Sequence, residues 1–295
     1  MANEADILER VKEGMKQPAK DIPSLRKFID RNSKALNAVP PEIGAFHEAV
    51  ELRPGLSADV SVPKGTAPFP VVIYLHGGGW VAGSAGSHRK LGMQFAEQGY
   101  LTINLDYRLA PENPFPAALD DCIFASEWAA VNASRWGGDA SRMAIGGDSA
   151  GGNLAAATMV EMGARQSPIR FKAGLLIYGL YDVPAVIARE KGAEFGLGMM
   201  ARAYLGDKYD ALVGDTRVSP LKAVKPGMPP QYILCGTADF LLKESKSMAE
   251  ACKAAGVEHE LDIVPEMPHG FIQIWMLSAA GAAQKRMFDW MRRRV

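Results

Sequence analysis

A serine lies at the centre of Gly147-Asp148-Ser149-Ala150-Gly151, between a short apolar run at residues 143–145 and an alanine-rich segment that begins at Gly152. A G-x-S-x-G sequence between a strand and a helix is typical of a nucleophile elbow, in which a sharp turn exposes the serine hydroxyl. The glycines fit this geometry, because a side chain two residues before or after the serine would collide with the neighbouring strand or helix. We therefore predict that Ser149 is a nucleophile and that Asp148, which must point away from it, has a buried hydrogen-bonding role.

A second glycine-rich motif, His76-Gly77-Gly78-Gly79-Trp80, directly follows an apolar run at residues 71–75. Glycines at this point let a substrate oxyanion approach the backbone with no Cβ in the way, so that successive N–H groups converge on it. In sites of this kind a further N–H comes from the residue after the nucleophile. We predict an oxyanion hole formed by Gly78, Gly79 and Ala150.

A serine nucleophile needs a general base, and the chain has five histidines: His47, His76, His88, His259 and His269. In elbow-type enzymes the chain order is serine, acid, histidine, so the base must follow Ser149. His259 begins an apolar strand-like run, whereas His269 lies in the loop beyond that run. Because active sites gather at the carboxyl ends of parallel strands, His269 is the predicted base and His259 a structural residue.

The acid that orients the base should also follow a strand, and two aspartates do so. Asp239 comes shortly after the apolar run at residues 231–235, and Asp182 follows the preceding run in the same manner. Asp182 also opens a helical segment, where an aspartate commonly serves as an N-cap. We therefore favour Asp239, whose carboxylate would fix the tautomer of His269 and stabilise its protonated form. Asp182 stays the alternative.

The elements that must position these residues follow from the alternation of apolar runs and helical patterns. The runs are short, mostly unalternating and bounded by Gly, Pro or Asp, as in strands covered on both faces. Strands are predicted at residues 71–75, 101–105, 143–145, 173–178, 231–235 and 261–264. Helices are predicted near residues 87–98, 115–131, 150–164, 242–255 and 274–293. Together with an antiparallel hairpin around Pro54-Gly55, this order predicts one α/β domain with an eight-stranded, mostly parallel sheet.

Two segments fall outside the alternation, at residues 1–45 and 183–218. The second follows the carboxyl end of a strand, where insertions commonly cover a site, and we expect it to act as a lid. Four residues are candidates for lining a substrate pocket, with ordinary packing as the alternative: Trp80, Met199, Met200 and Tyr204.

Composition excludes several other function classes. The 33 basic residues balance 33 acidic ones, so nothing favours binding to nucleic acid or to an anionic membrane surface. Three cysteines without C-x-x-C spacing argue against a disulfide framework and against a cysteine-ligated metal. The start lacks the order of a signal peptide, and no window approaches the roughly 18 apolar residues of a membrane span. We expect a cytoplasmic protein with a small-molecule substrate and leave a homo-oligomer open.

The two glycine motifs stand in series with Asp106-Tyr107-Arg108-Leu109-Ala110-Pro111-Glu112 and Pro268-His269-Gly270-Phe271. In this order they resemble the motifs of the bacterial hormone-sensitive-lipase-like esterases of the α/β-hydrolase superfamily, over about residues 70–275. The resemblance implies an α/β-hydrolase fold with a core of residues 46–182 and 219–295. Its helical cap would come from residues 1–45 and 183–218.

The same resemblance implies carboxylesterase activity on short acyl chains, without a metal or organic cofactor. It assigns the nucleophile to Ser149, the acid to Asp239 and the base to His269, with the oxyanion hole as above. One departure is visible, since the family usually has proline after the acid and this chain has Phe240.

Two alternatives stay open on the sequence. The same triad serves the hydrolysis of amides, formamides or lactones as well as esters. The plant gibberellin receptors, which resemble this family, bind a small molecule without catalysis, but they have lost the catalytic histidine that is present here as His269. Reaction with a fluorophosphonate would separate an enzyme from a receptor, because only an activated serine reacts readily.

Overall fold

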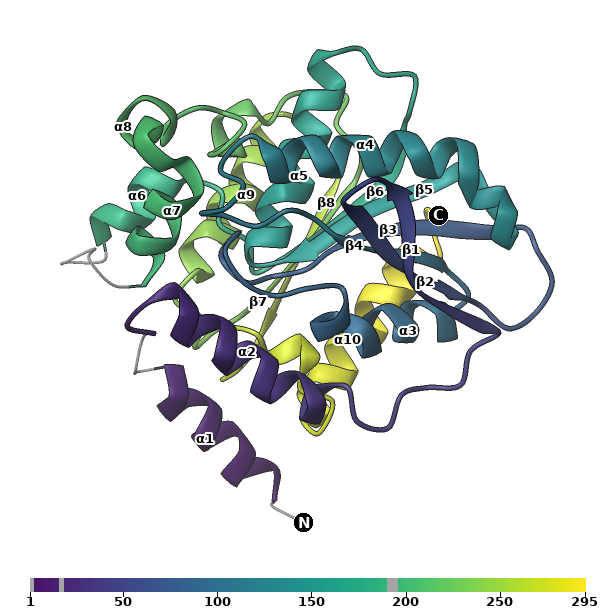
Figure 1. Cartoon of the computed structure of the whole chain (residues 1–295), viewed down its shortest axis with the longest axis horizontal. Coiled ribbons are helices and arrows are strands. Elements are labelled where there is room, and N and C mark those ends of the chain that lie inside the picture. Colours follow the sequence, from purple (N-terminus) through teal and green to yellow (C-terminus); the bar gives the residue numbers. More distant parts are fainter. Residues whose placement is uncertain (1–2, 16–18, 190–195) are drawn as a thin grey trace.

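The computed structural model describes residues 3–15, 19–189 and 196–295. Its eight strands form one sheet in the order β1-β2-β4-β3-β5-β6-β7-β8 (Figure 1). Strands β1 and β2 form an antiparallel hairpin, β2 also runs antiparallel to β4, and the pairings from β4 to β8 are parallel. The strands are β1 (Ala45–Arg53), β2 (Leu56–Val62), β3 (Phe69–Leu75), β4 (Leu101–Asp106), β5 (Gly138–Asp148), β6 (Phe171–Ile177), β7 (Gln231–Gly236) and β8 (His259–Val264).

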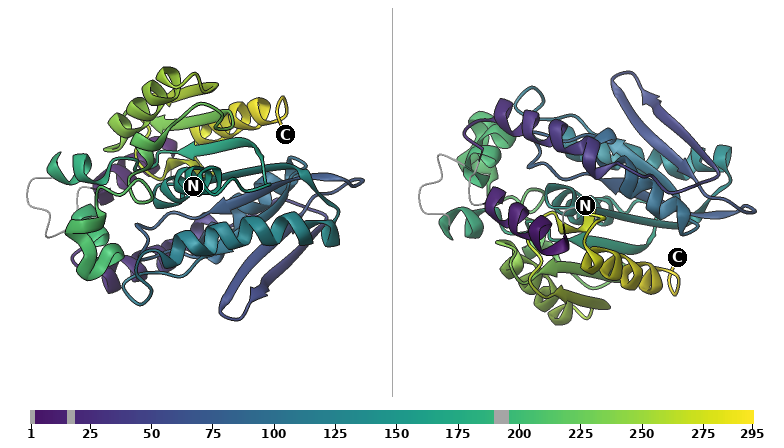
Figure 2. Two further views of the ribbon diagram at one scale, coloured as in Figure 1. Left: turned by 90° about the horizontal axis from the view of Figure 1, so that it is seen from above. Right: turned by 90° about the horizontal axis from the view of Figure 1, so that it is seen from below.

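Helices cover both faces of this sheet, because its central strands are apolar on both sides. Along β3, Val71, Ile73 and Leu75 face one hydrophobic cluster, and Val72 and Tyr74 face another. The first cluster contains residues of α4, α5 and α9, and the second contains residues of α3 and α10. The three layers are visible end-on in Figure 2.

The helices are α1 (Glu4–Met15), α2 (Ile22–Leu36), α3 (Arg89–Glu97), α4 (Ala117–Asn132), α5 (Ala150–Ala164), α6 (Val183–Arg189), α7 (Leu197–Leu205), α8 (Tyr209–Leu212), α9 (Leu242–Ala254) and α10 (Ser278–Met291). Short 3₁₀ helices are η1 (Gly86–His88), η2 (Ala133–Trp136), η3 (Gly206–Lys208), η4 (Pro220–Ala223) and η5 (Phe271–Gln273).

The prediction of an eight-stranded, mostly parallel sheet flanked by helices is confirmed. The two largest differences from expectation are at the starts of β5 and of the last helix. Strand β5 begins at Gly138, because Gly138 and Asp139 pair with Phe69 and Pro70 at the start of β3. The last helix begins at Ser278, since residues 271–273 form the separate 3₁₀ helix η5.

The two segments outside the alternation are mostly helical where the structure describes them. The first holds α1 and α2, and the insertion holds α6, α7 and α8. The views of Figure 2 place both sets of helices toward the same end of the sheet. Residues 1–2, 16–18 and 190–195 of the predicted cap lie outside the described residues.

Candidate active site

Ser149 is the single residue between the end of β5 and the start of α5, and its backbone has φ 54° and ψ −118°. A side chain rarely adopts this positive φ, and such strain is concentrated at functional sites. A Cβ built on Gly147 would lie 2.3 Å from the Leu75 carbonyl oxygen, and one on Gly151 only 1.9 Å from the same atom. The predicted steric need for both glycines is therefore confirmed.

Ser149 lies within hydrogen-bond distance of His269, which in turn contacts Asp239. The Ser149 Oγ is 2.8 Å from His269 Nε2, and His269 Nδ1 is 2.9 Å from Asp239 Oδ2 and 3.1 Å from Oδ1. The Asp239 carboxylate is fully buried and also accepts a 2.7 Å bond from the Leu241 N–H. With a proton on Nδ1, the imidazole can accept the serine proton on Nε2 while the carboxylate holds the ring in place.

The loops that carry Asp239 and His269 are joined to each other by hydrogen bonds. The Glu266 N–H donates to Thr237 Oγ1 at 2.7 Å, and the Ala238 N–H donates to the Met267 carbonyl at 3.1 Å. These loops follow adjacent parallel strands, β7 and β8, whose carboxyl ends meet at one edge of the sheet. Asp239 and His269 are therefore held by one connected pair of loops.

Two aromatic rings flank the His269 imidazole. Tyr178, at the end of β6, is fully buried with its ring centroid 4.7 Å from that of His269. Phe240, which stands where the resembling family has proline, lies at 4.6 Å and is 52% exposed. Tyr178 carries no motif signal in the sequence, although its position at the end of the predicted strand at residues 173–178 places it at the same sheet edge.

Asp182 and His259, the competing residues, lie elsewhere. Asp182 Oδ1 accepts the Ala185 N–H at 3.2 Å at the start of α6, as a helix-capping side chain does. His259 is the first residue of β8 and contacts the Val257 carbonyl through Nδ1 at 3.0 Å. The structure thus brings neither residue to Ser149.

The glycine-rich loop after β3 adopts a backbone that few other residues allow, with φ 128° at Gly78 and 63° at Gly79. Within the described ranges, the structure records no hydrogen bond from the N–H groups of Gly78, Gly79 or Ala150. Ala150 also opens the 15-residue helix α5, whose N-terminal dipole favours negative charge. These three amides are the predicted oxyanion donors.

The predicted pocket residues divide into two kinds. Trp80 and Tyr204 are both 1% exposed, and their rings stack at 4.8 Å, which fits the packing alternative. Met200 is partly exposed. Its thioether lies against Gly79 of the glycine-rich loop, so closely that a Cβ built on Gly79 would be 2.0 Å from the Met200 Sδ. Met199 is partly exposed on the same helix, α7. A pocket role for these two methionines stays a prediction.

Asn153, on α5, connects that helix to the chain at both ends of the insertion at residues 183–218. Its amide Nδ2 donates to the Leu180 carbonyl at 2.7 Å and to the Val218 carbonyl at 2.8 Å. Its Oδ1 accepts from the indole of Trp80 at 3.3 Å. The two ends of the insertion are therefore fixed to α5, the helix that follows Ser149.

No group of three or more His, Cys, Asp or Glu side chains in the described ranges could hold a metal ion. The three cysteines are buried and free. In this part of the chain, no helix has both the length and the apolar character required to cross a membrane.

Comparison with known proteins points to one family. A family model described as the α/β hydrolase fold matches residues 72–273. The carboxylesterase NlhH of Mycobacterium tuberculosis is 34% identical over 229 residues, which cover 72% of this chain and 70% of that protein. The ethyl acetate hydrolase of Pseudomonas putida is 32% identical over 212 residues, or 69% of this chain and 66% of that protein.

Solved structures give the same result over almost the whole chain. A hormone-sensitive lipase from a metagenome library superposes with a TM-score of 0.82 at 30% identity, covering 98% of this chain and 97% of that one. The match therefore includes the segments before and after the residues that the family model covers.

Proposed function

The chain belongs to the α/β hydrolase fold family, in its group of hormone-sensitive-lipase-like carboxylesterases, and from this premise we propose that it is a serine carboxylesterase acting on short-chain esters. The observation that carries the proposal is the 2.8 Å contact between Ser149 Oγ and His269 Nε2. A nucleophile within hydrogen-bond reach of a base, itself oriented by a third group, is the arrangement that acyl transfer requires.

In the proposed acylation step, Ser149 Oγ attacks the ester carbonyl carbon while its proton passes to His269 Nε2. The carbonyl oxygen becomes an oxyanion, which the N–H groups of Gly78, Gly79 and Ala150 stabilise. Collapse of this tetrahedral intermediate breaks the bond to the alcohol oxygen, which takes the proton from His269. The alcohol leaves, and an acyl ester of Ser149 remains.

Water then completes the cycle. His269 removes a proton from a water molecule, whose oxygen attacks the acyl carbon and forms a second tetrahedral intermediate. Its collapse returns the proton to Ser149 Oγ and releases the carboxylic acid. Asp239 keeps its charge throughout and stabilises the transient imidazolium.

A preference for short acyl groups is supported by two observations. The thioether of Met200 lies against Gly79, so the space above the oxyanion loop is restricted. A relative is named for the hydrolysis of ethyl acetate, the ester of a two-carbon acid. A panel of p-nitrophenyl esters from acetate to dodecanoate tests this preference, and we expect kcat/KM to be highest for acetate or butyrate. A maximum at dodecanoate would contradict it.

The replacement Ser149→Ala tests the catalytic proposal. We expect kcat for p-nitrophenyl butyrate to fall by at least about 10⁴-fold, because the nucleophile, base and acid act as a unit. The wild-type chain should react with a fluorophosphonate at one site, and the variant should not. Undiminished hydrolysis by the variant would overturn the esterase proposal, and a wild-type chain that resists the fluorophosphonate would favour a receptor.

A further inference from the structure

A buried polar cluster surrounds His88, which the proposed mechanism does not use. We call it the His88 cluster, and it consists of Tyr74, Gly77, Ser87, His88, Asp148 and Gln273. Only 5% of His88 and 3% of Asp148 is exposed. Buried polar groups in such a network are expected to have a role that compensates for their desolvation.

Asp148 is the charged member of the His88 cluster. Its carboxylate accepts from Tyr74 Oη at 2.9 Å and from the Gly77 N–H at 3.1 Å, which confirms the predicted buried hydrogen-bonding role. Burial acts to raise the pKa of this carboxyl, but the charge and hydrogen bond of His88, together with Tyr74, bring the pKa below its ordinary value. The anion is therefore maintained inside the protein by its partners.

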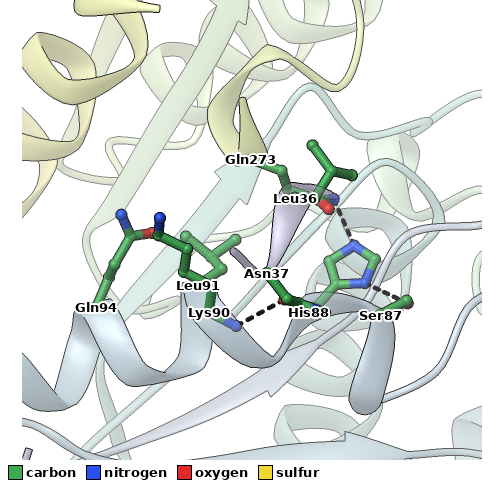
Figure 3. Close-up of a pocket in the computed structure, with 8 residues that line it drawn as sticks. All are labelled: Leu36, Asn37, Ser87, His88, Lys90, Leu91, Gln94 and Gln273. Carbon is green, nitrogen blue, oxygen red and sulfur yellow. Dashed lines mark hydrogen bonds between the residues drawn. The ribbon is translucent and has the colours of Figure 1, made fainter. Parts of the chain in front are cut away.

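One ring nitrogen of His88, Nε2, lies close to atoms of three separate segments of the chain. His88 Nε2 lies 2.6 Å from Gln273 Nε2, 3.2 Å from Asp148 Oδ1 and 3.4 Å from the Gly77 backbone nitrogen. The other ring nitrogen, Nδ1, is 2.8 Å from Ser87 Oγ. Figure 3 shows the imidazole between Ser87 and Gln273, with a hydrogen bond on each side.

Each of these three contacts is close in sequence to a group of the proposed active site. Gly77 directly precedes the oxyanion residue Gly78, and Asp148 directly precedes Ser149. Gln273 ends η5, four residues after His269. His88 itself belongs to none of these loops, since it ends η1 and leads into α3.

We propose that His88 is a positioning residue that holds the oxyanion loop, the nucleophile elbow and the loop of the base at their mutual spacing. This inference rests on the proposed esterase function. A shift of the loops relative to one another would misplace oxyanion donors, nucleophile and base while leaving the substrate-binding surfaces of each loop intact. Loss of His88 should therefore lower transition-state stabilisation more than substrate binding.

The test uses the full-length chain with three replacements, His88→Ala, His88→Gln and Gln273→Ala. Active sites are counted by fluorophosphonate labelling, so that kcat is expressed per reactive serine. For His88→Ala we expect kcat on p-nitrophenyl butyrate to fall about 10- to 100-fold while KM changes by less than about threefold. His88→Gln should recover part of kcat, because its amide can still contact Asp148 and Gln273.

A trifluoromethyl ketone provides a second readout, because its adduct with the serine presents an oxyanion. Its inhibition constant should rise in parallel with the loss of kcat/KM across the series. Gln273 is half-buried and easier to truncate, so Gln273→Ala carries the test if His88→Ala fails to fold. For it we expect a loss of kcat of about 3- to 10-fold.

Gln94→Ala is the matched control. Gln94 lines the same pocket in Figure 3, but its Oε1 accepts a hydrogen bond from Gln284, and among the described residues its side chain has no hydrogen bond to a member of the His88 cluster. Its kcat per labelled serine should equal that of the wild type. If the His88 and Gln273 variants lose only thermal stability, with unchanged kcat per serine and ketone affinity, the positioning role is overturned. A wild-type chain that is not labelled at all would instead reject the esterase function itself.

Discussion

At the residue scale, two aspartates that follow neighbouring strands are candidates for the acid, and they differ in what they contact. The Asp239 carboxylate lies 2.9 Å from His269 Nδ1, whereas that of Asp182 accepts the Ala185 N–H at the start of α6. Both positions satisfy the same sequence rule for the acid of an elbow-type enzyme. Only the path of the chain after each strand separates them.

Replacing each aspartate by asparagine tests which of the two orients His269. Asp239→Asn should lower kcat for p-nitrophenyl butyrate by about 10⁴-fold, because an amide stabilises the wrong tautomer of the base. Asp182→Asn should leave kcat within about twofold, since asparagine is an equally good N-cap. Steady-state kinetics on titrated enzyme decide between them. The reverse pattern would move the acid to Asp182.

The residues that touch at the candidate site could be predicted from the sequence, but the residues packed behind them could not. Ser149, Asp239 and His269 carry motif or strand-end signals that a single chain displays. His88 and Gln273 carry none, because their contact joins positions 185 residues apart and depends on how η1 and η5 pack. A buried aspartate beside the nucleophile did indicate that a partner must exist, but not which residue it was.

At the scale of elements, the end of β3 leaves no room for a side chain at the two glycines of the turn between β5 and α5. The nearest atom to a Cβ on Gly151 would be a backbone carbonyl, that of Leu75, which cannot move without shifting a central strand. By contrast, Gly281 lies inside α10 with no heavy atom within 4 Å of such a Cβ. Alanine at Gly281 is therefore a matched control for alanine at Gly151.

Gly151→Ala should destabilise the fold by about 3 kcal/mol or more, since a methyl group is forced against backbone in a closely packed region. Gly281→Ala should raise the free energy of unfolding by about 0.5–1 kcal/mol, because alanine favours a helix over glycine. Urea denaturation followed by circular dichroism measures both. An unchanged midpoint for Gly151→Ala would mean that the elbow can move away from β3.

The centre of the sheet was predictable because the central strands are covered on both faces and are therefore apolar along most of their length. The beginning of β5 was not, since it is mostly polar. Gly138 and Asp139 pair with Phe69 and Pro70 of β3, and the Asp139 carboxylate accepts hydrogen bonds from Ser141 and Arg142. Strand length at such a point is decided by the neighbouring strand. Composition within the segment itself does not determine it.

At the scale of the whole molecule, Arg26 connects the N-terminal helix α2 to the core. From α2 it donates through Nε to the Val81 carbonyl at 2.7 Å and through Nη2 to the Ala110 carbonyl at 3.0 Å. It also forms two hydrogen bonds, of 2.8 and 2.7 Å, with the Glu112 carboxylate. Val81 follows the oxyanion motif directly, so the first segment of the chain is fixed close to the proposed site.

This connection should depend on pH through Glu112. Hydrogen bonds from Arg26 lower the pKa of the Glu112 carboxyl from 4.5 to about 2. A folded-state pKa below the ordinary value means that the carboxylate stabilises the folded state above about pH 4.5 and that this contribution is lost as the pH falls to about 2. Because the Glu112 side chain is 57% exposed, solvent screening limits the contribution to about 1 kcal/mol or less.

Hydrogen exchange in α2 tests this last prediction. At pH 7, Glu112→Gln should lower the protection factors of α2 amides by about two- to fivefold. The difference from the wild type should shrink as the pH falls toward 2, because the Glu112 carboxyl is then increasingly protonated and neutral like the glutamine. Asp139→Asn is the control, because the pKa of Asp139 is also lowered to about 2, but by Ser141 and Arg142 on β5. That variant should change acid stability without changing exchange in α2 at pH 7. If the wild type keeps its α2 protection to pH 2, the backbone bonds of Arg26 to Val81 and Ala110 are sufficient to hold the helix, and the ion pair is not.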